Sequence, residues 1–208
     1  MEGVAPKYTE PHVSAVYKSK TCLDYEVDSQ MSPHKVPTYN GLSLDVKAEP
    51  KTGHFQAKLP FSGGGWCKWK IDRAFVSVNY TNVSHLVKDA VIYEGGGGTG
   101  LTAFINDAIQ INLSETKVLN TLEYSPIIYP VLAMTEGFPK SIFLQGEVGM
   151  RSFRLMLTPR AEWKITFKPK LDETKMPKVT VTKKGEWVEY PDGHIETDTQ
   201  MVDTRYIK

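Results

Sequence analysis

The feature that most constrains this chain is a long alternation of apolar and polar residues that follows a glycine turn. Residues 59–80 read LPFSGGGWCKWKIDRAFVSVNY. Successive side chains of a strand point to opposite faces, so the alternation predicts a long β-strand. The face expected to be buried carries Cys67, Trp69 and Ile71, and the opposite face carries Trp66, Lys68 and Lys70. The segment therefore predicts a sheet with one side in the core.

The same period-two pattern recurs along most of the chain. Leu23, Tyr25 and Val27 alternate with acidic residues, which predicts a half-buried strand. Residues 42–59 predict a hairpin, whereas residues 29–41, with two prolines, predict a loop. We therefore expect an all-β chain: an antiparallel β-sandwich or flattened barrel of about eleven to twelve strands, with little helix.

The length of 208 residues suits one large β domain. We expect a flexible N-terminal arm at residues 1–12 and a β-sandwich core at residues 13–168. Residues 169–208 predict a linker, a β-hairpin and a tail, packed on the same domain. The turn of that hairpin is the sequence YPDG at residues 190–193, in which proline suits the first corner and glycine the last.

The two cysteines, Cys22 and Cys67, bear on both stability and location. Each lies beside a strand pattern, which favours a disulfide over two buried free thiols. Such a bond closes a long loop, and loop entropy predicts a stabilisation of about 4 kcal/mol. Because no CxxC partner or histidine lies at ligand spacing, we expect no metal site.

The chain is expected to act outside the cytoplasm, in the periplasm or as a secreted protein. Disulfides persist in oxidising compartments, and free thiols would instead indicate a cytoplasmic protein. The polar start, with Pro6 and Pro11, is typical of a tether that follows a removed signal or lipid anchor. No apolar run is long enough to span a membrane. The net charge of +1 argues against binding to nucleic acid or to an anionic membrane.

No motif predicts catalysis or a cofactor. The glycine tract fits the outline of a phosphate-binding loop, but Leu101 stands where that loop needs lysine, so a flexible loop is expected. The tract comprises Gly95, Gly96, Gly97 and Gly98. There is no GxSxG nucleophile elbow, and the five histidines lie in separate polar segments. We therefore expect no catalytic residue and a non-enzymatic protein.

The tryptophans supply the best candidates for binding. Trp69 and Trp163 lie on apolar strand faces and are expected in the core, whereas Trp66 and Trp187 lie beside charges or turns. Exposed aromatic residues next to charges suit a protein interface or a surface that stacks on sugars. The candidate partner-binding residues are Trp66, Lys68, Lys70, Trp187, Tyr190 and His194.

Three functional hypotheses follow. The leading one is a protein-binding β-domain, such as a bacterial periplasmic inhibitor, an immunity-type protein or a surface accessory protein. The second is a carbohydrate-binding module that uses the exposed tryptophans. The third is a hydrolase whose site assembles only in the fold.

Overall fold

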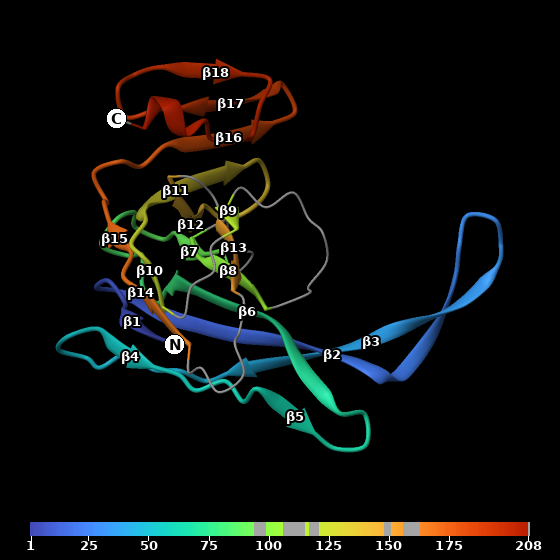
Figure 1. Ribbon diagram of the computed structural model, residues 1–208. Coiled ribbons are helices and arrows are strands. Elements are labelled where there is room, and N and C mark those ends of the chain that lie inside the picture. The colour runs from blue at the N-terminus through green and yellow to red at the C-terminus, as the bar shows by residue number, and fades with distance from the viewer. Residues whose placement is uncertain (94–98, 106–114, 117–120, 148–150, 156–162, 208) are drawn as a thin grey trace.

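A computed structural model describes residues 1–93, 99–105, 115–116, 121–147, 151–155 and 163–207. The described residues form three β-sheets and one short 3-10 helix (Figure 1). The predicted all-β fold with little helix is confirmed. The strands are more numerous than expected because several are only two or three residues long. The sheets are also mixed, with parallel as well as antiparallel pairs.

The first sheet has the strand order β3-β2-β6-β8-β13-β9, with β5 paired to β6. Its strands are β2 (Thr9–Val27), β3 (Pro33–Leu44), β5 (Ser62–Gly64), β6 (Trp69–Tyr80), β8 (Leu101–Ile105), β9 (Glu115–Thr116) and β13 (Arg151–Leu155). The long central strand β6 confirms the alternating strand predicted in residues 59–80, although it begins only at Trp69.

The second sheet has the order β18-β17-β16-β11-β12-β7, with β15 paired to β11. Its strands are β7 (Val91–Ile92), β11 (Ile127–Thr135), β12 (Ser141–Gly146), β15 (Lys170–Leu171), β16 (Lys178–Thr182), β17 (Gly185–Glu189) and β18 (Ile195–Thr197). The third sheet, β10-β14-β1-β4, contains β1 (Glu2–Val4), β4 (His54–Gln56), β10 (Thr121–Tyr124) and β14 (Lys164–Phe167). The helix η1 spans Thr204–Tyr206.

One apolar core is shared by all three sheets. Its fully buried members include Val13 and Val76 from the first sheet, Ile142 from the second, and Ile165 and Phe167 from the third. Each sheet therefore turns one face inward, as period-two strands with one buried face require.

The middle of the second sheet is buried on both faces. Ile128 and Leu132 of β11 belong to the shared core. Tyr129 and Val131 point the other way, into a smaller cluster with Val188, Tyr190 and Ile207, which lie nearer the C-terminus. The segment after β18, with Val202, Tyr206 and Ile207, thus packs against the outer face of this sheet.

Two local predictions are wrong. The hairpin expected at residues 42–59 does not form, because β4 pairs with β1 and β3 pairs with β2. Most of the loop expected at residues 29–41 is instead strand β3. An edge strand tolerates proline, since its outward N–H groups make no ladder bond. The residues expected to form a flexible N-terminal arm contain β1 and the start of β2. The glycine tract lies outside the described residues.

Candidate binding surface

A two-stranded ribbon, defined here as residues 20–37, projects from the body of the molecule (Figure 1). β2 and β3 pair from Val13 with Leu44 out to Val27 with Pro33, but β6 accompanies β2 only as far as Lys18. At about 3.3 Å per residue, the ribbon extends roughly 25 Å. An isolated two-stranded ribbon is only marginally stable in water, so its fastenings matter.

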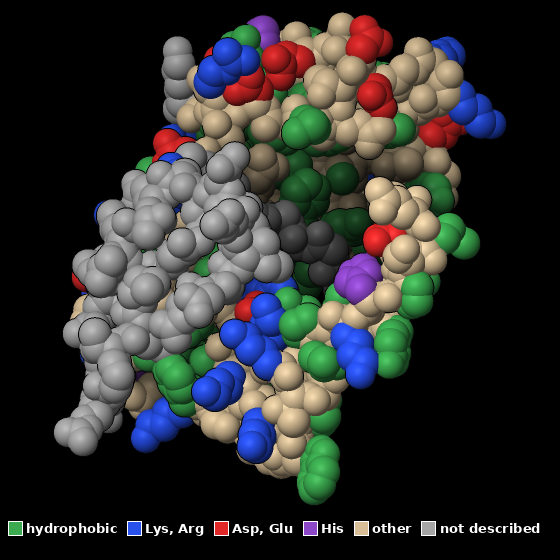
Figure 2. Space-filling view, turned by 45° about the vertical axis from the view of Figure 1, so that its right-hand side comes forward, with side chains coloured by type: hydrophobic (Ala, Val, Ile, Leu, Met, Phe, Trp, Pro, Cys, Tyr) green, Lys and Arg blue, Asp and Glu red, His purple; other side chains and the backbone are tan. Residues whose placement is uncertain are grey.

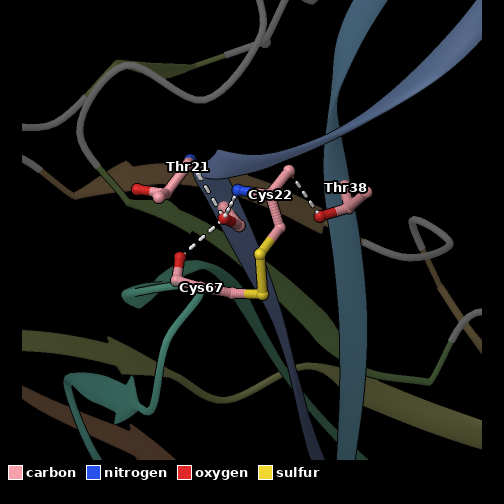
Figure 3. Close-up of a disulfide and its surroundings, with 5 residues drawn as sticks. Thr21, Cys22, Thr38 and Cys67 are labelled. Atoms are coloured by element: carbon pink, nitrogen blue, oxygen red, sulfur yellow. Dashed lines mark hydrogen bonds between the residues drawn. A yellow bond between two sulfur atoms is a disulfide. The ribbon is translucent and has the colours of Figure 1, made fainter.

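The base of the ribbon is fastened by the predicted disulfide, Cys22–Cys67, which is confirmed (Figure 3). The two Cα atoms are 5.1 Å apart, and the bond joins β2 to the turn between β5 and β6. The Thr38 hydroxyl donates to the Cys22 carbonyl at 2.8 Å. The crosslink lies where the pairing of β2 with β3 is irregular, between Ser19 and Leu23. Disulfides of this kind are typical of proteins in oxidising compartments.

The buried Ser19 hydroxyl organises the same base. It donates to the Cys67 carbonyl at 2.6 Å. It also accepts bonds from the main-chain N–H groups of Thr21 and Cys22, at 3.1 and 2.8 Å. One side chain therefore satisfies two N–H groups at the strand irregularity and one carbonyl in the turn between β5 and β6.

The tip of the ribbon is a hydrogen-bonded turn centred on Asp28. The Asp28 carboxylate accepts from the main-chain N–H groups of Gln30 and Ser32, both at 2.9 Å. The main-chain N–H of Asp28 donates to the Ser32 carbonyl at 3.2 Å, and Met31 takes a positive φ of 62°. Both ends of the ribbon are thus fixed by specific polar contacts.

One face of the ribbon is apolar and exposed. The register pairs Leu23 with Pro37, Tyr25 with Lys35, and Val27 with Pro33, and side chains of directly paired residues share a face. Leu23, Tyr25 and Val27 are 44%, 66% and 59% exposed. The predicted strand is therefore present, but its apolar face is exposed rather than half-buried, because no other described strand accompanies the ribbon.

The opposite face of the ribbon is mainly polar. It carries Asp24 paired with Val36 and Glu26 paired with His34. All the acidic side chains of the two paired strands within the ribbon therefore lie on this face, and Lys35 lies on the apolar face. The Lys35 ammonium lies 5.5 Å from the centre of the Tyr25 ring, a cation–π arrangement.

The apolar face continues onto the body of the molecule as a cationic and aromatic surface. Tyr39 lies on the same face of β3 as Lys35, and it pairs with Lys18 of β2. Lys18 also pairs with Lys70 of β6. The Tyr39 ring centre is 5.6 Å from the Lys18 ammonium and 5.8 Å from the Arg73 guanidinium. Lys and Arg side chains gather below the hollow at the centre of Figure 2.

Three of the predicted binding residues lie near the ribbon base. Trp66 is 90% exposed, and it lies beside Lys68 in the turn between β5 and β6, before the strand begins at Trp69. Positive φ angles at Gly64, Gly65 and Lys68 form this turn. Lys70 is exposed on β6.

The other three predicted binding residues lie at the far end of the molecule, where β17 and β18 are labelled in Figure 1. The Trp187 indole donates to Glu189 at 3.0 Å. Tyr190 is buried, and its hydroxyl donates to Glu196 and accepts from the main-chain N–H of Asp203. Burial and the Glu196 hydrogen bond raise the pKa of Tyr190. The structure does not bring this set together with Trp66, Lys68 and Lys70.

Two surface clefts lie on the described part of the molecule. One, of about 570 Å³, is lined by residues that include Gln56, Lys58, Phe61 and Trp163. The other, of about 530 Å³, lies near the C-terminus and is lined by Glu196, Thr197, Thr199, Met201, Val202 and Asp203. Within the described ranges, no group of three or more His, Cys, Asp or Glu side chains could hold a metal ion. No helix of the described chain is long and apolar enough to cross a membrane.

Comparison with known proteins found no matching family model, no matching curated protein and no matching solved structure. The class of the protein is therefore defined by its own fold and surface: an all-β chain with a disulfide-fastened, projecting ribbon. Sequence reasoning found the alternating residues of β2 but not the ribbon. The alternation of Leu23, Tyr25 and Val27 is the same whether their face is buried or exposed, so it carried no signal for the ribbon.

Proposed function

We propose that this chain is a non-enzymatic, extracytoplasmic protein-binding domain that uses the ribbon as its binding element. The observation that carries the proposal is the exposed apolar face of Leu23, Tyr25 and Val27 on a ribbon fixed at both ends. Exposed apolar patches mark interaction sites, and a preorganised element loses less entropy on binding.

The disulfide supports an oxidising compartment for this function. A rigid projection of roughly 25 Å is suited to entering a cleft of a partner protein. The leading class is therefore a periplasmic inhibitor, an immunity-type protein or a surface accessory factor. In each case the ribbon enters the partner, and the exposed Trp66 and Lys70 at its base contact the rim.

Site-specific photo-crosslinking tests the proposal. A photoreactive amino acid is placed at Tyr25, and in a separate variant at Met201, which is 81% exposed outside the ribbon. We expect one stoichiometric partner to crosslink from position 25 in cells of the source organism and not from position 201. Excess unmodified protein should compete the product away. Equal products from both positions, or none from position 25, would contradict the proposal.

Carbohydrate binding is the second candidate, and the cleft beside Trp163 favours it. Phe61 and Trp163 supply aromatic surfaces there, and Gln56 and Lys58 supply hydrogen-bond donors for hydroxyl groups. Titration of the intrinsic tryptophan fluorescence with a panel of oligosaccharides checks this candidate. A saturable change that is lost in a Phe61→Ala variant supports it, and a flat response across the panel contradicts it.

A further inference from the structure

We infer that the ribbon binds its partner by strand addition along the free edge of β2 at residues 23–27, and that the added strand alternates apolar and basic residues. The inference rests on the proposed function and names the chemistry of its partner. Its first support is the direction of the backbone groups. Just beyond the last paired residues, Val27 and Pro33, the main-chain N–H of Asp28 donates to the Ser32 carbonyl, so positions 28 and 32 continue the register as a hydrogen-bonded position. Such pairs alternate with non-hydrogen-bonded pairs along the strands.

That alternation fixes which N–H groups face outward. Asp24 and Glu26 direct their backbone groups to β3, whereas Leu23, Tyr25 and Val27 direct theirs to the opposite edge. β6 no longer accompanies β2 at these positions. The edge therefore offers three N–H and three C=O groups at alternate residues, the pattern that strand addition uses.

The other edge of the ribbon is closed to the same interaction. By the same alternation, the outward-facing residues of β3 within the ribbon are Pro33, Lys35 and Pro37. Proline has no N–H, so only Lys35 can donate from this edge. Prolines and lysine on an edge strand are also the usual protection against unwanted pairing. The two edges thus differ sharply, and the β2 edge is the open one.

The acidic side chains of the ribbon disfavour pairing of its β2 edge with the β2 edge of a second copy of this chain. A twofold pairing of two β2 edges keeps each face of the ribbon against its own equivalent. It would place the Asp24 and Glu26 face of one copy beside the same acidic face of the other, and like charges across a pair are destabilising. A partner strand with Lys or Arg on this face, and apolar residues on the face of Tyr25, removes the conflict.

Asp24 also protects the edge in the free protein. Its carboxylate accepts from the N–H of Tyr25 at 2.8 Å, so the central outward donor is satisfied. When a carbonyl of the added strand takes over that N–H, the Asp24 carboxylate becomes available to a basic side chain of the partner. The same residue therefore limits unwanted pairing and selects for positive charge.

Peptide binding to the full chain tests the inference. The probes are acetylated seven-residue peptides that alternate valine with lysine, and matched peptides that alternate valine with glutamate. The informative variants are Val27→Pro, which removes an outward N–H without removing a ribbon bond, and Val27→Ala, which shortens the side chain alone. We expect the lysine peptide to bind the wild type and Val27→Ala, and to bind Val27→Pro about tenfold more weakly or worse.

The inference would be overturned if the lysine peptide did not bind, or if the glutamate peptide bound as tightly as the lysine peptide. It would also be overturned if Val27→Pro and Val27→Ala bound the lysine peptide equally well. A dimer of the free chain that Val27→Pro abolishes would show that the edge pairs with a second copy instead. Leu23→Pro and Leu23→Ala form a second matched pair if Val27→Pro fails to fold. A partner that crosslinks from position 25 but binds Val27→Pro normally would leave the proposed function standing and remove strand addition alone. Peptide binding without any crosslinked partner would show that the edge can add a strand and would contradict the proposed function.

Discussion

The Ser19 hydroxyl donates a hydrogen bond to the Cys67 carbonyl at 2.6 Å, across a gap of 48 positions in the sequence. This contact lies next to the Cys22–Cys67 disulfide, so a covalent bond and a hydrogen bond join the same two segments. Together they hold the ribbon to the β5–β6 turn at the point where β6 stops accompanying β2.

Replacing Ser19 with alanine should loosen the ribbon. The change leaves the N–H groups of Thr21 and Cys22 and the carbonyl of Cys67 without this partner, and Ser19 is buried. We expect a loss of about 1–3 kcal/mol in the free energy of unfolding. Urea denaturation measures the loss, and amide hydrogen exchange should speed up in residues 20–37. Ser32→Ala, at an exposed position, is the control; an equal effect of both changes would contradict the role of Ser19.

Removing the disulfide should cost more. The bond joins residues separated by 45 positions, and the loop-entropy relation gives about 4 kcal/mol for a loop of this length. We expect the Cys22→Ala, Cys67→Ala double variant to unfold at a clearly lower urea concentration than the wild type. The reduced wild-type protein should match the double variant. Unfolding midpoints that are the same with and without the bond would show that it contributes no stability.

The sequence predicted the disulfide because both cysteines lie beside strand patterns, and it predicted β6 because its alternation is long and local. It failed for β3, because Pro33 and Pro37 are typical of loops unless the strand lies at an edge, and edge position is a property of the whole sheet. It also failed for β4, whose partner β1 is about fifty residues away, a separation that local turn signals cannot specify. The ribbon could not be predicted because exposure of its apolar face depends on where β6 ends.

Two tyrosines of the C-terminal cluster should respond oppositely to replacement by phenylalanine. Among the residues that the structure describes, the buried Tyr129 hydroxyl has no hydrogen-bond partner, whereas the Tyr190 hydroxyl bonds to Glu196 and to the N–H of Asp203. We expect Tyr129→Phe to raise the free energy of unfolding by about 1 kcal/mol and Tyr190→Phe to lower it by about 1–3 kcal/mol. Urea denaturation of both variants near pH 7 measures the difference. Destabilisation by Tyr129→Phe equal to that by Tyr190→Phe would contradict the assignment.

Stability should also fall in alkali, and Tyr129 should account for part of the fall. Burial, with the nearby charges of Glu147 and Asp203, raises the pKa of Tyr129 from its ordinary value of 10.0 to about 12. Above pH 10 the unfolded chain therefore loses this proton more readily than the folded chain does, so the free energy of unfolding falls as the pH rises. The stabilising contribution is complete below pH 10 and is lost as the pH rises toward 12.

The comparison of the wild type with Tyr129→Phe isolates this contribution, because the two chains share every other titrating group. Between pH 9 and pH 11 we expect the wild type to lose about 1 kcal/mol more of its free energy of unfolding than the variant does. Urea denaturation at half-unit pH steps measures both curves. Parallel curves across this range would show that Tyr129 ionises equally easily in the folded and unfolded chains, which its buried position in the cluster with Val131 and Val188 does not allow.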